Sequence, residues 1–573
     1  MKEKCVIYGL NRVTKDFLYI FAGRFEVTVI IDDEKKVEEW CEIPISDSGY
    51  LDRISPDEKI IVCGFDKRHA VETLETRGFR KDEDYFFEEE FFKDVDYYKV
   101  PDKPVVVWGT GINAKKLLTA SPEFKISFFI DAKKAIKEFC GYEVKRPEEI
   151  DNWSDYFVII SFARDAEAID YLEERGFVYP RDYINARVVY DSPSRLLKET
   201  IFDQKSYSFV CNSVLNHLEI VTDGNTAVCC TTFMEKGLDR LKNVSADRMW
   251  NSTMHKVLTL STENRTYTFC IKDMCPFFIG RKNAVIDDSY IPSEKPYRQY
   301  EERPKVVALG YDSTCNLACE TCRCEVHIAK GREKREAEEL SDLIVSDGFL
   351  KDTEFLIAAG DGEVFLSHAY KRVYMNPVCN DIAYIRFLSN GTLFTPDRWN
   401  EFRKGKNGKV MLTVSVDAAT KNTYEKIRRN GKFEELKKNM EFAAALKRSK
   451  DLSYFRMNFV VQQKNYLEMP AFVEWAKQLN CDEAFFTKIL NWGTYSNEEF
   501  KKISMMEEDG NTPKPELKEI LELPIMKDPI VDLGTIQYSH PGVQEKNIEN
   551  YYMWEMHRKE PELFKNFFID KTD

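Results

Sequence analysis

Between residues 304 and 500, short apolar runs alternate with longer helical stretches. The short runs are rich in β-branched and aromatic residues, which favour strands. They predict strands at 306–312, 355–359, 382–388, 410–416, 455–461 and 483–489. Helices are predicted between them, including 335–345, 421–428, 433–447 and 468–479. Six such units predict an α/β fold whose parallel sheet closes partly into a (β/α)6 barrel.

An internal repeat organises residues 1 to about 195. Cys5-Val-Ile-Tyr-Gly9 corresponds to Val105-Val-Val-Trp-Gly109, and four later landmarks recur in the same order, with offsets of 98–100 residues. Each copy has the pattern of a strand, a tight turn, a helix, a strand that ends in aspartate, and a further strand and helix. This alternation predicts a parallel sheet covered by helices in each copy. We expect the two copies to span 1–98 and 99–195.

The second copy carries part of a phosphate-binding pattern. Gly109-Thr-Gly111 precedes a predicted helix, and Asp131 ends the next strand. Backbone amides at such a turn can approach a phosphate, and the aspartate can bind a ribose. The third glycine is missing, and the first copy retains only Gly9. The second copy resembles the small Rossmann-like domains that precede sugar acyltransferases and some sugar-modifying enzymes, which implies nucleotide-linked sugars as candidate ligands. For the pair of copies, an architectural or docking role is the favoured alternative.

Composition narrows the class of partner. The chain of 573 residues is 43% hydrophobic and 13% aromatic, which is ample for packed cores, and its formal net charge is −14. Nucleic acids and anionic membranes attract basic patches, so neither is expected as the main partner. No run approaches the roughly 18 apolar residues of a membrane span. The N-terminus leads directly into a predicted strand without a signal-peptide pattern, so we expect a cytoplasmic protein.

Cysteines are concentrated in one part of the chain. Nine of the fifteen lie between residues 211 and 324. In a reducing compartment, clustered thiols are more often metal ligands than disulfides. The remaining six have apolar or strand-like neighbours and are expected in cores: Cys5, Cys41, Cys63, Cys140, Cys379 and Cys481.

Three of the clustered thiols follow the first predicted strand of the 304–500 region. Cys315, Cys319 and Cys322 are spaced by three and then two intervening residues. Thiolates suit zinc and iron–sulfur clusters, and three of them leave one coordination position open. Polar residues also follow the second, third and fourth predicted strands. Each alone could be a turn, a loop or a helix cap, but the carboxyl ends of parallel strands form one edge, where ligands gather.

This region resembles the radical S-adenosylmethionine (radical SAM) superfamily over the whole predicted barrel. The resemblance implies that Cys315, Cys319 and Cys322 hold a 4Fe–4S cluster whose fourth iron chelates the methionine part of S-adenosylmethionine. Residues implied to bind this cofactor are Gly360, Asp361, Gly362, Glu363, Ser389, Asn390, Ser415, Asp417 and Arg428. Within this set, Ser415 and Asp417 match ribose contacts, and Arg428 matches a methionine carboxylate contact. Thr321 and Val364 depart from the residues that are common at their positions in the family.

A second group of cysteines precedes the predicted barrel. Two short runs around Asp223-Gly-Asn predict a β-hairpin, which leads to Cys229 and Cys230. By count, four thiols of this region fit an iron–sulfur cluster or zinc equally well, and unmetallated core thiols are a further alternative. The hairpin, the Trp250-Asn-Ser helix start and the final Cys-x4-Cys-Pro resemble SPASM or twitch auxiliary-cluster domains, here expected at 200–295. In many relatives this domain follows the barrel instead of preceding it.

The resemblance to auxiliary-cluster domains implies a second 4Fe–4S cluster. Four ligands are expected from Cys211, Cys229, Cys230, Cys270 and Cys275. The favoured set omits Cys229, because adjacent residues on a strand point to opposite faces and only one of Cys229 and Cys230 should reach a given cluster.

The resemblance to radical SAM enzymes also implies the reaction class. The reduced cluster cleaves S-adenosylmethionine, and the resulting 5′-deoxyadenosyl radical takes hydrogen from a C–H bond of the substrate. An oxidation, an epimerisation or a cross-link follows, so the enzyme is expected to be an oxidoreductase or isomerase with flavodoxin or ferredoxin as electron donor. Cys324 is a candidate hydrogen donor, with a solvent-facing helix position as the alternative.

The substrate divides the remaining hypotheses. The resemblance of the second copy favours an activated or nucleotide-linked sugar, whereas the auxiliary-cluster resemblance favours a peptide or protein. A non-enzymatic, cysteine-rich zinc scaffold is the third hypothesis. Residues 501–573 are expected to form a helical tail beyond the barrel at 304–500.

Overall fold

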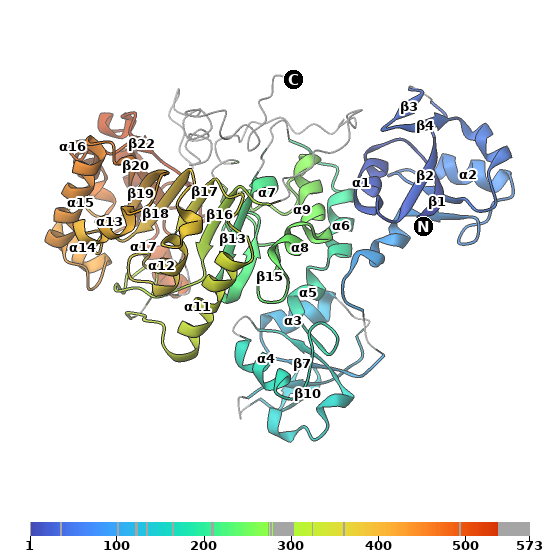
Figure 1. The fold of residues 1–573 in the computed structure, drawn as a ribbon, viewed down its shortest axis with the longest axis horizontal. Helices are drawn as coiled ribbons and strands as arrows, with labels where there is room; N and C mark the ends of the chain where they lie inside the picture. The colour runs from blue at the N-terminus through green and yellow to red at the C-terminus, as the bar shows by residue number, and fades with distance from the viewer. Residues whose placement is uncertain are drawn as a thin grey trace. The chain divides into compact units, whose positions relative to one another are not determined.

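The computed structural model describes most of residues 2–536. Outside the described part lie residues 1, 35–36, 100–101, 121–123, 133–135, 163–164, 208–210, 212, 273, 276–277, 279–302, 324, 359–360, 492–493 and 537–573. The chain divides into two compact units, which we describe one at a time (Figure 1). The first contains residues 1–208, 252–268 and 285–299, and the second contains residues 209–251, 269–284 and 300–573. Among the described residues, no helix has the length and apolarity needed to span a lipid bilayer.

The first unit contains two six-stranded sheets with one topology. The first sheet has the order β3-β4-β2-β1-β5-β6, and the second has the matching order β9-β10-β8-β7-β11-β12. The strands are β1 (Glu3–Tyr8), β2 (Phe25–Ile31), β3 (Glu39–Trp40), β4 (Ile43–Ser46), β5 (Lys59–Val62), β6 (Tyr85–Phe87), β7 (Val105–Trp108), β8 (Ile126–Ile130), β9 (Glu138–Phe139), β10 (Tyr142–Lys145), β11 (Phe157–Ile160) and β12 (Tyr183–Asn185). Within each copy only the β3–β4 or β9–β10 pair is antiparallel. The predicted duplication is therefore confirmed by the strand order.

Helices connect and flank these sheets. They are α1 (Arg12–Phe21), η1 (Ser48–Arg53), α2 (Arg68–Thr76), η2 (Glu88–Val95), α3 (Ile112–Ala120), η3 (Pro147–Glu149), η4 (Trp153–Asp155), α4 (Ala166–Glu173), α5 (Ala186–Tyr190), α6 (Pro193–Phe202) and α9 (Thr253–Glu263). Local sequence explains where two of them begin. The Asn11 side chain accepts hydrogen bonds from the first amides of α1, and Ser192 caps α6 just before its proline.

Two of the six cysteines expected in cores lie instead at the tips of equivalent hairpins. Cys41 joins β3 to β4 and is half-buried, and Cys140 joins β9 to β10 and is exposed. Both residues have a φ of +52°, the left-handed conformation that a tight hairpin turn requires. The apolar neighbours of these cysteines belong to short strands that end immediately beside the turn, so the prediction was wrong there. Cys5, Cys63 and Cys379 are buried as expected, and Cys481 is partly buried.

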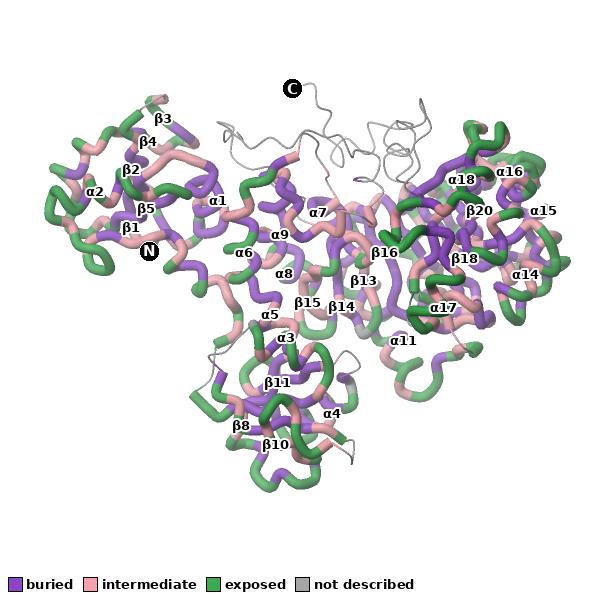
Figure 2. Tube along the Cα trace, turned by 180° about the vertical axis from the view of Figure 1, so that it is seen from behind, coloured by how far each residue is buried: buried purple, intermediate pink, exposed green. Residues whose placement is uncertain are grey.

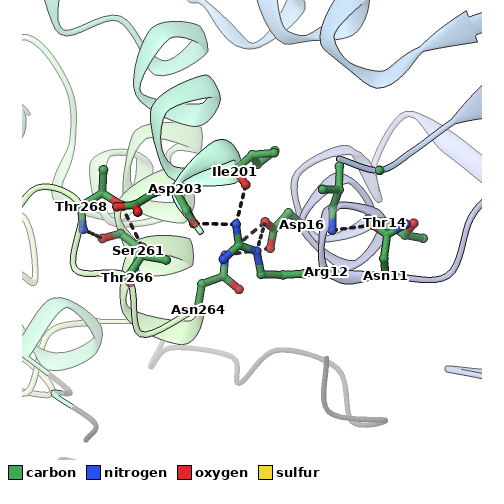
Figure 3. Close-up of polar contacts among 12 residues, drawn as sticks. Asn11, Arg12, Thr14, Asp16, Ile201, Asp203, Ser261, Asn264, Thr266 and Thr268 are labelled. Carbon is green, nitrogen blue, oxygen red and sulfur yellow. Dashed lines mark hydrogen bonds and ion pairs between the residues drawn. The ribbon is translucent and has the colours of Figure 1, made fainter. Parts of the chain in front are cut away.

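Arg12, at the start of α1 and just after β1, makes hydrogen bonds inside the first unit (Figure 3). Its Nη2 donates hydrogen bonds to the carbonyl oxygens of Ile201 (2.5 Å) and Asp203 (2.7 Å) at the end of α6. One turn along α1, the buried Asp16 accepts two hydrogen bonds of 3.1 Å from the Asn264 amide that follows α9. A cation at a helix C-terminus pairs with otherwise unbonded carbonyls. The end of the first copy that corresponds to a ligand edge is thus used for packing.

The second unit is built on one ten-stranded sheet with the order β15-β14-β13-β16-β17-β18-β19-β20-β21-β22. Its strands are β13 (His217–Val221), β14 (Asn225–Ala227), β15 (Gly237–Arg240), β16 (Val306–Gly310), β17 (Phe355–Ala358), β18 (Tyr384–Ser389), β19 (Lys409–Ser415), β20 (Leu452–Val461), β21 (Glu483–Lys488) and β22 (Val531–Asp532). The six strands predicted from the sequence are β16 to β21, and each pairs in parallel with the next. Figure 2 shows these strands buried along most of their length.

Helices of the second unit follow its strands. They are α7 (Ser213–Asn216), η5 (Thr222–Gly224), α8 (Ala246–Trp250), α11 (Gly331–Ser346), α12 (His368–Tyr374), η6 (Pro377–Cys379), α13 (Pro396–Arg403), α14 (Lys421–Ile427), α15 (Phe433–Arg448), η7 (Tyr466–Glu468), α16 (Met469–Gln478), α17 (Asn497–Ile503), α18 (Pro515–Leu521) and η8 (Pro524–Lys527). The four predicted helices correspond to α11, α14, α15 and α16. In Figure 1, α13 to α16 lie together beside β18 to β20.

The predicted cysteine-rich hairpin is part of this same sheet. Strands β13 and β14 pair in antiparallel fashion, as expected around the Asp-Gly turn. However, β13 also pairs in parallel with β16, with His217 beside Val306 and Glu219 beside Ala308. The strands expected in a small domain at 200–295 therefore extend the sheet that carries Cys315, whereas α9 belongs to the first unit. In the expected tail, α18 and β22 are observed, and residues after 536 lie outside the described part.

Candidate active site

The cysteine loop follows β16 and is anchored on both sides. The Cys315 amide donates to the carbonyl oxygen of His327 (2.7 Å). Farther along the loop, the Ala318 amide donates to the Arg429 carbonyl (3.1 Å), and the Glu320 amide donates to the Ile427 carbonyl (2.9 Å). These backbone bonds tie the loop to the segment after α14, which is more than 100 residues away in the sequence. The three thiols are therefore held by elements that the cysteine spacing alone does not specify.

Each of the three thiols faces a side-chain N–H donor. Asn390 Nδ2 lies 3.8 Å from Cys315 Sγ, Arg428 Nη1 lies 3.5 Å from Cys319 Sγ, and Arg323 Nε lies 3.5 Å from Cys322 Sγ. Burial raises the pKa of the Cys315 and Cys319 thiols, and the Arg428 guanidinium opposes this rise at Cys319. The three thiols are thus soft sulfur ligands, and their three side-chain N–H donors stabilise negative charge on sulfur.

The glycine-rich edge after β17 is pressed against the start of the cysteine loop. A Cβ on Gly362 would lie 2.4 Å from the Asp312 carbonyl oxygen and 2.6 Å from the Thr314 carbonyl oxygen. The Glu363 amide donates to this same Thr314 oxygen over 2.7 Å. A side chain at residue 362 would therefore break the contact, which explains the glycine. Asp361 and Gly362 lie here as predicted, and Gly360 lies outside the described residues.

Glu363 braces the loop that follows β18. Its buried carboxylate accepts hydrogen bonds from Ser389 Oγ (2.7 Å), the Asn390 amide (2.7 Å) and the Phe365 amide (3.2 Å). Burial raises the pKa of Glu363, and these donors oppose the rise. The Asn390 side chain can thereby reach Cys315 from a fixed loop. The structure thus brings together three predicted cofactor-binding residues, and Glu363 holds the other two in place.

Asp417 and Arg428 pair with each other in the interior. Arg428 Nη2 lies 2.6 Å from Asp417 Oδ2, and the two side chains are only 12% and 1% exposed. Asp417 has a left-handed φ of +64°, and its other oxygen accepts a hydrogen bond from the Val460 amide (2.8 Å). Burial disfavours charge on both groups and raises the pKa of Asp417. At Arg428 burial lowers the pKa, but Asp417, Cys319 and Tyr424 together outweigh burial and raise it. The predicted ribose and methionine contacts of these residues stay predictions, while Ser415 stands half-buried at the end of β19.

Residues 313–461 match the family model described as Radical SAM superfamily. The chain carries a radical SAM domain. The match begins two residues before Cys315 and ends with β20, so it contains the cysteine loop and its three N–H donors. Enzymes of this superfamily use a 4Fe–4S cluster and S-adenosylmethionine, and the three thiols fit the soft ligands that such a cluster needs.

Several solved structures are similar to part of this chain. SuiB from Streptococcus suis bound to S-adenosylmethionine is 14% identical over 35% of this chain and 43% of its own, with a TM-score of 0.26. TYW1 with a lysine-pyruvate adduct bound is 14% identical over 38% of this chain and 73% of its own, with a TM-score of 0.27. A radical SAM methyltransferase from Sphaerobacter thermophilus is 12% identical over 30% and 52%, with a TM-score of 0.21. The chain thus spans less than half of this SuiB structure, and no curated protein matches the chain.

Sequence reasoning missed Arg323, which links the radical SAM cysteine loop to the glycine-rich edge. Its guanidinium donates to the carbonyl oxygens of Ser313 (2.6 Å) and Asp361, as well as to the Cys322 thiol. Its position directly after Cys322 was an available signal, because a cation beside a ligating thiol lies within reach of the same sulfur. Cys324, the predicted hydrogen donor, lies outside the described residues.

Of the five cysteines upstream of the radical SAM domain, Cys211 precedes the β13–β14 hairpin and the other four follow it. Strand β14 ends at Ala227, so Cys229 and Cys230 lie in a bend and the predicted alternation of faces does not apply. Burial raises the pKa of the Cys229 thiol, and the neighbouring thiols of Cys275, Cys211, Cys230 and Cys270 raise it further. At Cys230 the next contribution after burial comes from Glu219. The other four thiols thus influence Cys229 electrostatically, while the ligand set favoured from the sequence, which omits Cys229, stays a prediction.

Neither cysteine group has the convergent geometry of a single-ion site. Within the described residues, no group of three or more His, Cys, Asp or Glu side chains is placed to hold one metal ion. Ligands of a single zinc ion must converge on one point. Ligands of a cluster bind different iron atoms and lie farther apart.

A polar patch covers the inner face of the sheet, which also carries Val306 and Phe355. Arg386 donates two hydrogen bonds to Thr413 Oγ1 (3.0 and 2.8 Å), and Arg456 Nη1 lies 3.5 Å from Glu483 Oε1. Strand register places these residues on one face, together with Tyr454, Asn458 and Asp532. Arg386, Glu483 and Asp532 are 2–3% exposed, and burial raises the pKa of Asp532. Burial of a charged group costs free energy unless the group is paired with another side chain or binds a ligand.

The added strand β13 contributes two more groups to this inner face. His217 is 2% exposed, and neither ring nitrogen has a hydrogen-bond partner among the described residues. Burial lowers its pKa to about 4, so the imidazole is neutral at pH 7. Burial, and to a lesser extent the charge of Asp361, raises the pKa of Glu219 to about 7. Glu219 thus stands within electrostatic range of both the glycine-rich edge and Cys230.

Proposed function

We propose that this chain is a radical SAM enzyme in which Cys315, Cys319 and Cys322 hold a 4Fe–4S cluster and leave one iron open for S-adenosylmethionine. The observation that carries the proposal is the matched set of three anchored thiols and three N–H donors inside the radical SAM domain. When bound, the cluster and S-adenosylmethionine supply an electron and a carbon-centred radical able to take a hydrogen atom from a C–H bond. A flavodoxin or ferredoxin is the proposed electron donor.

The chain's own residues position this chemistry. The edge at Asp361 and Gly362 offers backbone groups to the methionine part of the cofactor, directly beside the cysteine loop. Ser389 and Asn390 form the next strand end, and Glu363 holds both rigidly. Ser415 stands at the end of β19, where it can meet a ribose. A rigid edge of this kind orients a bound cofactor without rearrangement.

We assign a second, auxiliary 4Fe–4S cluster to Cys211, Cys229, Cys270 and Cys275. The mutual electrostatic influence of their thiols supports this set, and the electrostatic influence of Glu219 on Cys230 sets Cys230 apart. An auxiliary cluster supplies a redox centre beside the substrate. This assignment favours an oxidation over an epimerisation as the outcome. The hydrogen-donor role of Cys324 belongs to the epimerisation alternative.

For the substrate we propose a small, polar, anionic molecule of the class of activated or nucleotide-linked sugars. The buried guanidinium groups of Arg386 and Arg456 suit a phosphate, and Glu483, Asn458 and Asp532 suit hydroxyl groups. An extended peptide would need unpaired backbone groups or apolar subsites to bind. The polar inner face supports the sugar over the peptide.

Iron content and cofactor cleavage test the enzyme class. Anaerobically reconstituted protein should hold about eight irons, the sum of two 4Fe–4S clusters. On reduction with dithionite it should cleave S-adenosylmethionine to 5′-deoxyadenosine. A variant with Cys315, Cys319 and Cys322 changed to alanine should keep about four irons and lose cleavage. Bound zinc without cleavage would overturn the proposal in favour of a cysteine-rich scaffold.

Substrate class is tested with matched panels. Nucleotide-linked sugars and short peptides are each added to the reduced enzyme, and a substrate is recognised because it accelerates 5′-deoxyadenosine formation and takes up a hydrogen label from it. Arg386→Gln should raise the KM for an accepted sugar nucleotide without changing dithionite-driven cleavage in its absence. Arg403→Gln removes a guanidinium from α13 and serves as the control. Acceleration by peptides alone would overturn the sugar proposal.

A further inference from the structure

Three N–H donors reach the three thiols of the cysteine loop from three separate parts of the chain. Asn390 comes from the loop after β18, Arg428 follows α14, and Arg323 belongs to the cysteine loop itself. Each contact has a distinct side-chain donor, and the Leu317 amide also donates to Cys315 Sγ over 3.5 Å. Two of the three donors are guanidinium groups, which carry a permanent positive charge.

Burial of the Arg428 and Asp417 side chains costs free energy on folding. The guanidinium and the Asp417 carboxylate are both removed from water, and a buried ion pair of this kind is often no better for stability than an apolar pair. Asp417 also takes a left-handed backbone conformation, which costs free energy in a residue with a side chain. A costly arrangement aimed at a single sulfur atom points to a functional role instead of a stabilising one.

We propose that Arg428, oriented by Asp417, is a positioning residue that sets the reduction potential of the cluster on Cys315, Cys319 and Cys322, with Asn390 and Arg323 as weaker contributors. The inference rests on the proposed function. Reduction adds one negative charge to a cluster, and N–H donors and cations at its sulfur atoms stabilise the reduced form more than the oxidised form. The three donors therefore raise the potential.

The size of each contribution follows from burial and charge. Arg428 is mostly buried, so water and salt screen its charge weakly. Arg323 is half-buried, and Asn390 is buried but neutral and more distant from its sulfur. Arg428 should have the largest effect. Asp417 neutralises part of its charge, so removal of the Asp417 carboxylate alone should raise the potential still further.

Redox titrations monitored by electron paramagnetic resonance test this order. The signal followed is the one that is absent from the protein in which all three cysteines are alanine. Arg428→Met in an Asp417→Asn background avoids a buried unpaired carboxylate, and it is compared with Asp417→Asn alone. We expect the added Arg428→Met change to reduce the equilibrium constant for one-electron reduction at least tenfold, which is 59 mV for a one-electron couple. Asp417→Asn alone should shift the potential upwards.

Arg429→Met is the matched control. Arg429 is the next residue, is exposed, and donates to the carbonyl oxygens of Ala318 (2.7 Å) and Arg323 (2.8 Å) instead of to a thiol. Its replacement removes the same charge near the same loop, and we expect a much smaller shift. Arg323→Met gives a second, solvent-accessible probe that does not disturb the interior. It should lower the potential by less than the Arg428 change.

The outcomes separate this inference from the proposed function. Equal shifts for the Arg428 and Arg429 changes would mean that net charge acts without directed contacts, and the inference would be wrong. Unchanged potentials in protein that binds iron and cleaves S-adenosylmethionine would also overturn it, while the proposed function stands. If the double variant fails to retain iron, Arg323→Met and Arg428→Lys decide, because Arg428→Lys keeps the charge and should keep most of the potential.

Discussion

Gly362→Ala is the sharpest structural test of how the glycine-rich edge meets the cysteine loop. The new methyl group would lie 2.4 Å from the Asp312 oxygen, 2.6 Å from the Thr314 oxygen and 3.1 Å from the Thr314 nitrogen. All three atoms belong to the backbone, so no side chain can rotate away. One strand end must move, and the hydrogen bond from the Glu363 amide to Thr314 is lost with it.

The cost can be worked out from these contacts. Overpacking of this kind costs about 1–3 kcal/mol, and the lost hydrogen bond adds about 1 kcal/mol. The sum of about 2–4 kcal/mol corresponds to a fall in Tm of roughly 3–6 °C for a unit of this size. Affinity for S-adenosylmethionine should fall as well, because the displaced edge carries the backbone groups offered to the cofactor.

Two measurements check this prediction. Differential scanning calorimetry gives the Tm, and isothermal titration of the anaerobic, cluster-loaded protein gives the affinity for S-adenosylmethionine. Gly23→Ala is the control, since its added Cβ meets no atom within 4 Å and its change should stay within about 0.5 kcal/mol. A Gly362→Ala protein with the Tm and affinity of the parent would refute the close approach of the two loops.

Three further predictions concern other parts of the chain. Burial raises the pKa of Glu88 in the folded state to about 7. The unfolded state therefore loses its proton at a lower pH than the folded state. The free energy of unfolding should fall as the pH rises from about 4.5 to 7. Hydrogen exchange of the first repeat should show this loss, up to about 3 kcal/mol, and Glu88→Gln should abolish it. Arg12→Met removes two hydrogen bonds, one of them fully buried, and should cost about 3–5 kcal/mol, seen as faster exchange at the end of α6, whereas Arg68→Met at an exposed pair should leave that exchange unchanged. Cys229→Ala should lose about four irons and Cys230→Ala should retain them; the reverse pattern would restore the ligand set favoured by the sequence.

Much of the second unit could be predicted from the sequence because its signals are local. Each of the strands β16 to β21 is a short apolar run, and the pattern of a run does not depend on its partners. The spacing of Cys315, Cys319 and Cys322 is equally local, and so is the Asp-Gly turn of the hairpin. The repeat of the first unit was visible because two copies of one strand order preserve the same landmarks.

Predictions failed where a residue's role depended on what lies beside it in space. Cys41 and Cys140 have the neighbours of core residues but stand at hairpin tips. The choice between Cys229 and Cys230 stays a prediction, but its argument from strand alternation does not apply, because β14 ends at Ala227. The hairpin was expected in a separate domain, since nothing local to β13 indicates that its partner is β16.

By itself, the sequence determined the strand and helix pattern, the duplication and the three-thiol motif of the radical SAM domain, because these depend on residues within a few positions of one another. Only the tertiary structure decided which distant groups face Cys315 and Cys319. Arg428 reaches Cys319 across 109 residues of sequence, and Asn390 reaches Cys315 across 75. Such contacts depend on the pairing of several strands in one sheet, so they exist only once the whole sheet has formed.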